Sequence, residues 1–180
     1  MRYAGIIFND TAAAPGICLS FYTQGCPIRC EGCHNYEMWD ENGGHEFTPD
    51  VLDRVIKGLH ANGINRTFCI LGGEPLSTQN AFLTALLVST VKEKSPNTPI
   101  WIWSGYSMEE LMSTSDTHIK RVLENINGLV TDPFQLTLRD ITLKFRGSSN
   151  QRVWAFDSQK KLWYNIEKEE ERFQLNDRKR

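Results

Sequence analysis

The sequence has little of what marks a membrane or nucleic-acid-binding protein. Its 180 residues include 20 Lys and Arg against 22 Asp and Glu, so the formal net charge is −2. Binding to a polyanion requires an excess of clustered cations, and we therefore expect no nucleic-acid partner. The longest apolar stretch, near residues 81–91, is far shorter than the ~20 residues of a membrane-spanning helix, so we expect no membrane partner either.

Signals for secretion are also missing. The first ten residues, MRYAGIIFND, contain one cation and no apolar run of signal-peptide length, so we expect a cytoplasmic protein. The five cysteines are an odd number, and three of them fall within eight residues. A secreted disulfide framework usually has an even number of cysteines spread along the chain. Metal binding or catalysis in a reducing compartment is therefore the better hypothesis.

Strand and helix patterns alternate along most of the chain. Short runs rich in β-branched and aromatic residues predict strands at Tyr3–Phe8, Ile17–Tyr22, Thr67–Leu71, Ile100–Trp103 and Gly128–Thr131. Amphipathic segments predict helices after Thr48, over Gln79–Lys94 and from Ser107 towards Ile126. This order predicts an α/β fold with β-α-β crossovers and a mostly parallel sheet, with ligands at the carboxyl ends of the strands.

The pattern changes beyond Phe134. Val153–Phe156 and Leu162–Ile166 flank a polar turn and predict an antiparallel hairpin. Residues 167–180 include ten charged residues among fourteen, for which we expect a solvated helix or a disordered end. We therefore predict one domain over residues 1–166 and a charged tail over residues 167–180.

Three cysteines lie close together after the second predicted strand. Cys26, Cys30 and Cys33 have the spacing C-x3-C-x2-C. A structural zinc ion and a fully protein-ligated 4Fe-4S cluster both need a fourth ligand, and His34 is too near Cys33 in sequence to chelate the same ion. Three cysteines on a four-iron cluster leave one iron open to a substrate, which indicates an enzyme. A zinc-stabilised binding module remains the alternative from a different class.

A second motif, Gly72-Gly73-Glu74-Pro75, directly follows a predicted buried strand. Two glycines allow the backbone to approach a ligand closely, Glu74 offers an acceptor to an ammonium group, and Pro75 stiffens the loop. Such a glycine pair alone is more often a simple turn. Its position, one β-α-β unit after the cysteines, is what favours a shared site.

Together the two motifs resemble the radical S-adenosylmethionine superfamily. The resemblance implies an incomplete β/α barrel in which S-adenosyl-L-methionine binds the open iron of a 4Fe-4S cluster. It implies that the metal ligands are Cys26, Cys30 and Cys33. It assigns the binding of the cofactors to Gly32, Cys33, His34, Gly72, Gly73 and Glu74.

Within that superfamily the chain is similar to the activating proteins of anaerobic, class III, ribonucleoside-triphosphate reductases. The similar segments are Pro15-Gly16, Gly25-Cys26, CEGCHN at 30–35 with Trp39, the glycine motif with Gln79-Asn80, IWIWSGY at 100–106 and RGSSNQR at 146–152. The last is the most discriminating. The resemblance implies that a 5′-deoxyadenosyl radical, formed by reductive cleavage of S-adenosyl-L-methionine, takes a hydrogen atom from a glycine of the reductase. It implies two partners, the catalytic subunit of that reductase and a low-potential, flavodoxin-like electron donor.

Two positions depart from the family pattern. Cys18 stands where the family commonly has an arginine, and Asp132-Pro133-Phe134 replaces an Asp-Gly-x-aromatic turn. Residues 146–152 are interpreted either as a docking surface for the reductase or as a structural turn. Activation of a different glycyl radical enzyme is the alternative that keeps the same chemistry.

Overall fold

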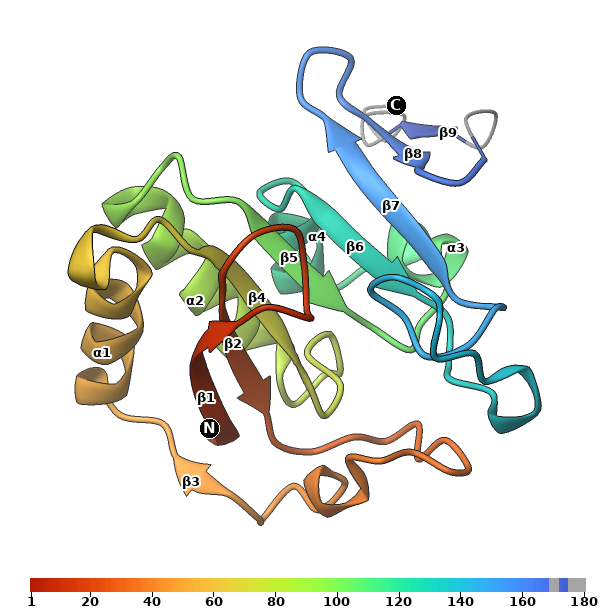
Figure 1. Cartoon of the computed structure of the whole chain (residues 1–180), viewed down its shortest axis with the longest axis horizontal. Coiled ribbons are helices and arrows are strands. Elements are labelled where there is room, and N and C mark those ends of the chain that lie inside the picture. The colour runs from red at the N-terminus through yellow and green to blue at the C-terminus, as the bar shows by residue number, and fades with distance from the viewer. Residues whose placement is uncertain (169–171, 175–180) are drawn as a thin grey trace.

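The computed structural model describes residues 1–168 and 172–174. In this part of the chain nine strands form one open sheet with the order β3-β1-β2-β4-β5-β6-β7-β8-β9. The strands are β1 (Arg2–Asp10), β2 (Cys18–Thr23), β3 (His45–Glu46), β4 (Thr67–Gly72), β5 (Ile100–Trp103), β6 (Gly128–Thr131), β7 (Arg152–Asp157), β8 (Leu162–Asn165) and β9 (Arg172–Gln174). The helices are α1 (Pro49–Leu59), α2 (Ala81–Lys94), α3 (Met108–Ser113) and α4 (Thr117–Leu123), and Figure 1 shows their arrangement around the sheet.

The sheet is parallel only in its centre. β2, β4, β5 and β6 are parallel neighbours, whereas β1, β3, β7, β8 and β9 join the sheet by antiparallel pairing. The expectation of an α/β fold is confirmed, and the expectation of a mostly parallel sheet is wrong. Parallel neighbours need a crossover connection, which the helices supply between the central strands. The links from β1 to β2 and from β7 to β8 contain no helix, and short links of this kind join antiparallel strands.

The first helix begins after Thr48 as the sequence predicts, the second begins at Ala81 rather than Gln79, and the helical region expected from Ser107 towards Ile126 is divided into α3 and α4. Pro49 opens α1, and Asn62 and Gly63 follow it with φ of 59° and 71°, in the left-handed conformation that stops a helix. Ser107 and Glu110 form a capping box at the start of α3. Among the described residues, no helix is both long enough and apolar enough to cross a membrane.

Side chains of the central strands alternate between two faces. On one face Leu19, Ile70 and Ile102 join buried residues of the helices in the main hydrophobic core. On the other face a smaller core contains Cys18, Cys69, Trp101, Val130 and Val153, with Leu71, Trp103 and Phe145 partly buried beside it. Among the described residues this smaller core contains none from a helix, so its face is the one on which a site can open.

The C-terminal hairpin is confirmed, since β7 and β8 pair in antiparallel register. The expectation for the charged tail is wrong for Arg172–Gln174, which forms strand β9 on β8. The ring of Phe173 meets the buried ring of Trp154 edge to face, and this contact explains why a strand forms in so polar a segment. The remaining tail residues, 169–171 and 175–180, lie outside the described residues. The division into a domain over 1–166 and a tail over 167–180 stays a prediction.

Candidate functional site

A cavity of about 1140 Å³ opens on the face of the sheet that the helices leave uncovered. It lies at the carboxyl ends of β2, β4 and β5, where the chain leaves each strand for the next loop. Its lining includes every residue that the sequence assigned to cofactor or metal binding: Cys26, Cys30, Gly32, Cys33, His34, Gly72, Gly73 and Glu74. The two motifs are therefore brought to one cavity, and the role of each residue stays a prediction.

The cysteine loop is fixed at its start by backbone hydrogen bonds. Gly25 N donates to Met38 O at 2.8 Å, and Cys26 N donates to Trp39 O at 3.2 Å. All three thiols of the loop are unpaired. Burial raises the pKa of Cys26 and of Cys30.

The donor set fits an iron–sulfur cluster better than a single ion. A structural zinc ion needs four ligands about 2.0–2.3 Å from one point, and the cysteine loop offers three thiols. The thiolates that bind a 4Fe-4S cluster do not have to meet at one point, because each thiolate binds a different iron. Three free thiols on the wall of a roomy cavity meet this requirement.

The glycine motif is packed directly against the start of the cysteine loop. Gly73 N donates to Thr23 O and Glu74 N donates to Gly25 O, both at 2.9 Å. A Cβ at Gly73 would lie 2.4 Å from Gly25 O. This glycine is therefore required by close contact between two backbones, a reason that the sequence did not reveal.

Asn80 is a site residue whose role the sequence analysis missed. Its buried side-chain amide donates to Gln24 O, Gly25 O and Glu74 O at 3.0, 3.1 and 3.0 Å. One side chain thus ties the cysteine loop to the glycine motif. The sequence marked Gln79-Asn80 only as a segment similar to the family, within the predicted helix over Gln79–Lys94, and it assigned Asn80 no role.

Glu74 is buried at the wall of the cavity, with 1% of its surface exposed. Its Oε1 accepts from Leu76 N and Ser104 Oγ, both at 2.9 Å, and its Oε2 accepts from Gly105 N at 2.7 Å. Burial raises the pKa of this carboxyl group to about 7, against the lowering effect of the three hydrogen bonds. Oε2 retains capacity for a further donor, which is what the binding of an ammonium group requires.

The raised pKa of Glu74 predicts a pH-dependent stability. Between the ordinary pKa of 4.5 and the folded value of about 7, the folded chain binds more protons at this residue than the unfolded chain does. The free energy of unfolding should therefore fall as pH rises through this window, by up to about 3 kcal/mol, and this loss should level off above it. Glu74→Gln does not titrate and should lack this component.

The measurement is urea unfolding of the wild type and of Glu74→Gln under anaerobic conditions at pH 5 and pH 8. Other carboxyl groups titrate in both proteins, so the difference between their two pH dependences isolates Glu74. Identical pH dependences would contradict the assignment of a raised pKa to this residue.

The two cysteines outside the loop are core residues. Cys18 and Cys69 are fully buried in neighbouring strands of the smaller core. A hydrogen bond between the two thiols lowers the pKa of Cys18 and raises that of Cys69. Cys18, which replaces a common family arginine, therefore packs within the sheet, and Cys18 and Cys69 are absent from the cavity lining.

Comparison with known proteins agrees with this geometry. The protein-family model described as "4Fe-4S single cluster domain" matches residues 12–154, which defines the chain as an iron–sulfur protein of that class. A protein named anaerobic ribonucleoside-triphosphate reductase-activating protein, from Salmonella typhimurium strain LT2, is 35% identical to this chain over 85% of this chain and 97% of that protein. A protein of the same name from Vibrio cholerae is 32% identical over 87% of this chain and 99% of that protein. One from Enterobacteria phage T4 is 30% identical, over 86% and 94%. The chain belongs to the family of anaerobic ribonucleoside-triphosphate reductase-activating proteins.

Proposed function

We propose that this chain is an activating enzyme that generates a glycyl radical on an anaerobic ribonucleoside-triphosphate reductase. The observation that carries the proposal is the single cavity in which the three loop cysteines and Gly72–Glu74 meet, in a chain that belongs to this family. A cytoplasmic location and a low-potential, flavodoxin-like electron donor complete the proposal. Both follow from the resemblance and from the chemistry that it requires.

Cys26, Cys30 and Cys33 would hold the 4Fe-4S cluster, and S-adenosyl-L-methionine would complete its ligand set. The chemistry that the bound cluster supplies is one-electron reduction of the sulfonium, which gives methionine and a 5′-deoxyadenosyl radical that takes a hydrogen atom from a glycine of the reductase. Glu74 would accept from the methionine ammonium group through Oε2. Gly72 and Gly73 would keep the backbone close to that end of the ligand, and Gly32 and His34 would line the same site.

The proposal includes a partial β/α barrel of the radical S-adenosylmethionine type. The parallel neighbours β2, β4, β5 and β6 form its β-α-β part, with helices on one face and the cavity on the other. The sheet is open, with β3 and β9 at its edges in the described part of the chain. An open barrel fits a substrate that is itself a protein, because the partner can close the site and exclude water.

The rim of the cavity carries exposed apolar side chains on the loop between β6 and β7. Ile141 is 81% exposed and Leu136 is 45% exposed, and both line the cavity. Apolar side chains grouped at the mouth of a cavity indicate a contact surface for another protein. We propose that this rim contacts the reductase when the two proteins bind.

Ile141→Glu should therefore impair activation of the reductase and spare the chemistry of the cluster. A charge placed in an apolar contact must be desolvated on docking, so we expect at least about a tenfold lower rate of glycyl radical formation at limiting reductase. Cleavage of S-adenosyl-L-methionine with a chemical reductant and no reductase should be unchanged. The two rates are measured side by side in the same anaerobic preparation.

Phe82→Glu is the matched control, since Phe82 is 51% exposed on α2, on the helix-covered side of the sheet. It should activate the reductase at the wild-type rate. An Ile141→Glu variant that also activates normally would remove the rim from the docking surface.

The decisive test of the proposed function is anaerobic incubation of the chain with a reductant, S-adenosyl-L-methionine and an anaerobic ribonucleoside-triphosphate reductase. Electron paramagnetic resonance should then show a glycyl doublet on the reductase. A radical that appears only on another glycyl radical enzyme would favour the alternative partner. A colourless protein with one zinc and no sulfide would establish the zinc-stabilised module instead.

A further inference from the structure

Strand β1 has an edge that is largely unpaired. On one side β1 pairs with β2 along most of its length, whereas on the other side β3 pairs only with Arg2 and Tyr3 in the part of the chain that the structure describes. Further along the strand, Phe8 O accepts from Arg66 Nε at 2.6 Å. Among the described residues, the main chain of residues 4–7 therefore has no second strand on that side.

This edge borders the cavity, because Ala4, Gly5, Ile6 and Ile7 all line it. Consecutive side chains of a strand point to opposite faces of the sheet. Ile6 accordingly packs against the main core, and Ile7 is 47% exposed. A cavity that both residues line extends around the edge of the strand. An extended segment of another chain that entered the cavity would meet this edge.

Gly5 is a glycine that the fold of this chain does not require. Its φ lies outside the left-handed region, and a Cβ at this position would meet no atom within 4 Å. The pairing with β2 is irregular between Tyr3 and Gly5, but a β-bulge needs glycine only where a residue is left-handed. A glycine inside a strand often marks a place where another backbone approaches closely. Gly5 leaves room for such an approach.

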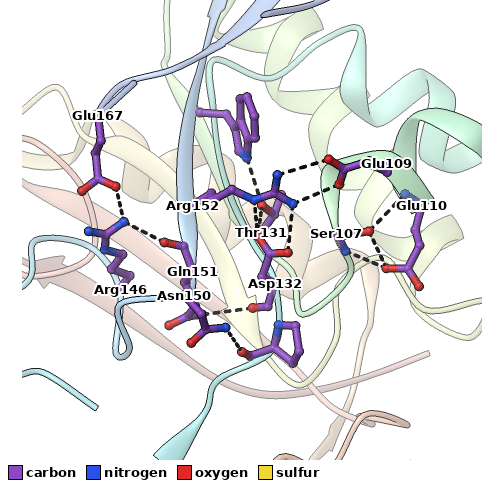
Figure 2. A network of polar contacts seen from close by, with 12 residues as sticks. Ser107, Glu109, Glu110, Thr131, Asp132, Arg146, Asn150, Gln151, Arg152 and Glu167 are labelled. Atoms are coloured by element: carbon purple, nitrogen blue, oxygen red, sulfur yellow. Dashed lines mark hydrogen bonds and ion pairs between the residues drawn. The ribbon is translucent and has the colours of Figure 1, made fainter. Parts of the chain in front are cut away.

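Another wall of the cavity, between β6 and β7, is held by bonds within the protein. Residues 146–152, which the sequence left as a docking surface or a turn, form a turn bound to the loop after β6. Figure 2 shows that Asn150 donates to Pro133 O at 2.8 Å and that Arg152 donates to both carboxylate oxygens of Asp132, at 2.8 and 3.0 Å. These side chains are used inside the protein, which favours a structural turn. The edge of β1 is the stronger candidate for binding another chain.

We propose that an extended segment of the reductase, the one that carries the reactive glycine, pairs with residues 4–7 of β1 as an added strand. The inference rests on the proposed function for the identity of the partner. The hydrogen atom that is removed belongs to the main chain of a glycine, and an added strand binds through its main chain. Ile141 and Leu136 line the same cavity, so one partner can contact this edge and the apolar rim together.

Hydrogen–deuterium exchange measures this pairing directly. The anaerobically reconstituted chain is labelled alone and with excess reductase, in the presence of S-adenosyl-L-methionine and without reductant. We expect exchange within residues 4–7 to slow by at least about tenfold in the complex, because the N–H groups that face away from β2 become hydrogen-bonded. Helix α2 should exchange at the same rate in both samples.

Unchanged exchange at residues 4–7, in a preparation that forms the glycyl radical once reductant is added, would overturn the inference and leave the proposed function intact. Slower exchange at these residues on concentrating the chain alone would also overturn it, because the partner would then be a second copy of this chain. A chain that forms no glycyl radical on the reductase would defeat the proposed function itself.

Ile7→Lys tests the same edge by mutation. A lysine on an edge strand opposes pairing with another chain, so we expect the Kd for the reductase to rise by at least about tenfold. Ile17→Lys is the matched control, since Ile17 is 38% exposed on the same β1–β2 hairpin and is not among the residues described as lining the cavity. It should bind the reductase with the wild-type Kd. A folded Ile7→Lys protein with the wild-type Kd would contradict the proposed pairing.

Discussion

Cys30→Ala should yield a folded chain that assembles no stable 4Fe-4S cluster and cleaves no S-adenosyl-L-methionine. Cys30 lies in a loop at the cavity wall, so its loss leaves the core of the sheet intact. Two thiolates would remain to hold four irons. Even the loss of a group that only supports a metal ligand costs about 10–100-fold in affinity or activity, so the loss of a ligand should cost at least about 100-fold.

The measurement is iron and sulfide content after anaerobic reconstitution, followed by the rate of S-adenosyl-L-methionine cleavage. Cys69→Ala is the control with the same chemical change in a buried strand. It should lower stability by about 1–2 kcal/mol through the void that it leaves, and it should load the cluster normally. A Cys30→Ala protein with wild-type iron content and cleavage would refute its assignment as a ligand.

The sequence predicted the assembly of the site because two short motifs follow two strands that pair in parallel. Cys26 and Gly73 are 47 positions apart in the chain, yet β2 and β4 pair from Cys18 with Thr67 to Thr23 with Gly72. This register carries the two loops to the same edge of the sheet. The β-α-β pattern therefore determined the most important long-range feature of the molecule.

Strand pairing does not predict which side chains bind backbone groups that are far away in the sequence. Asn80 binds the carbonyl oxygens of Gln24 and Gly25, and no periodicity or spacing relates these positions. Asp132, which directly follows β6 and has a positive φ, is bound by Arg152 of β7. The sequence marked residues 132–134 and 146–152 as unusual, and only the structure shows that they are bound to each other.

The outer strands show a different limit. Short polar links and alternating side chains identified the β7–β8 hairpin, because those signals are local. The ring of Phe173 in β9 packs against Trp154, but the strand lies in the segment 167–180, in which ten of fourteen residues are charged. The charged composition of the tail predicted a solvated helix or a disordered end, and it gave no sign of the contact with Trp154. The expectation for Arg172–Gln174 was therefore wrong.

Gly73→Ala should disable the site because the new side chain would clash with backbone atoms. The added Cβ would lie 2.4 Å from Gly25 O, 3.0 Å from Gly25 C and 3.1 Å from Thr23 O. All three atoms belong to the main chain, so no change of rotamer relieves the contact. Either the end of β4 or the start of the cysteine loop must move, and the 2.9 Å bond from Glu74 N to Gly25 O must lengthen.

We expect this variant to lose about 1–3 kcal/mol of stability and at least about 100-fold in S-adenosyl-L-methionine cleavage, because the movement separates the cysteines from Glu74. Gly63→Ala is the matched control: its φ of 71° strains an alanine, but no atom lies within 4 Å of the new Cβ. It should cost about 1 kcal/mol and keep full activity. Urea unfolding, iron content and cleavage rates of the three proteins separate the two effects. Wild-type cleavage by Gly73→Ala would show that the contact between the two loops is not needed for the reaction.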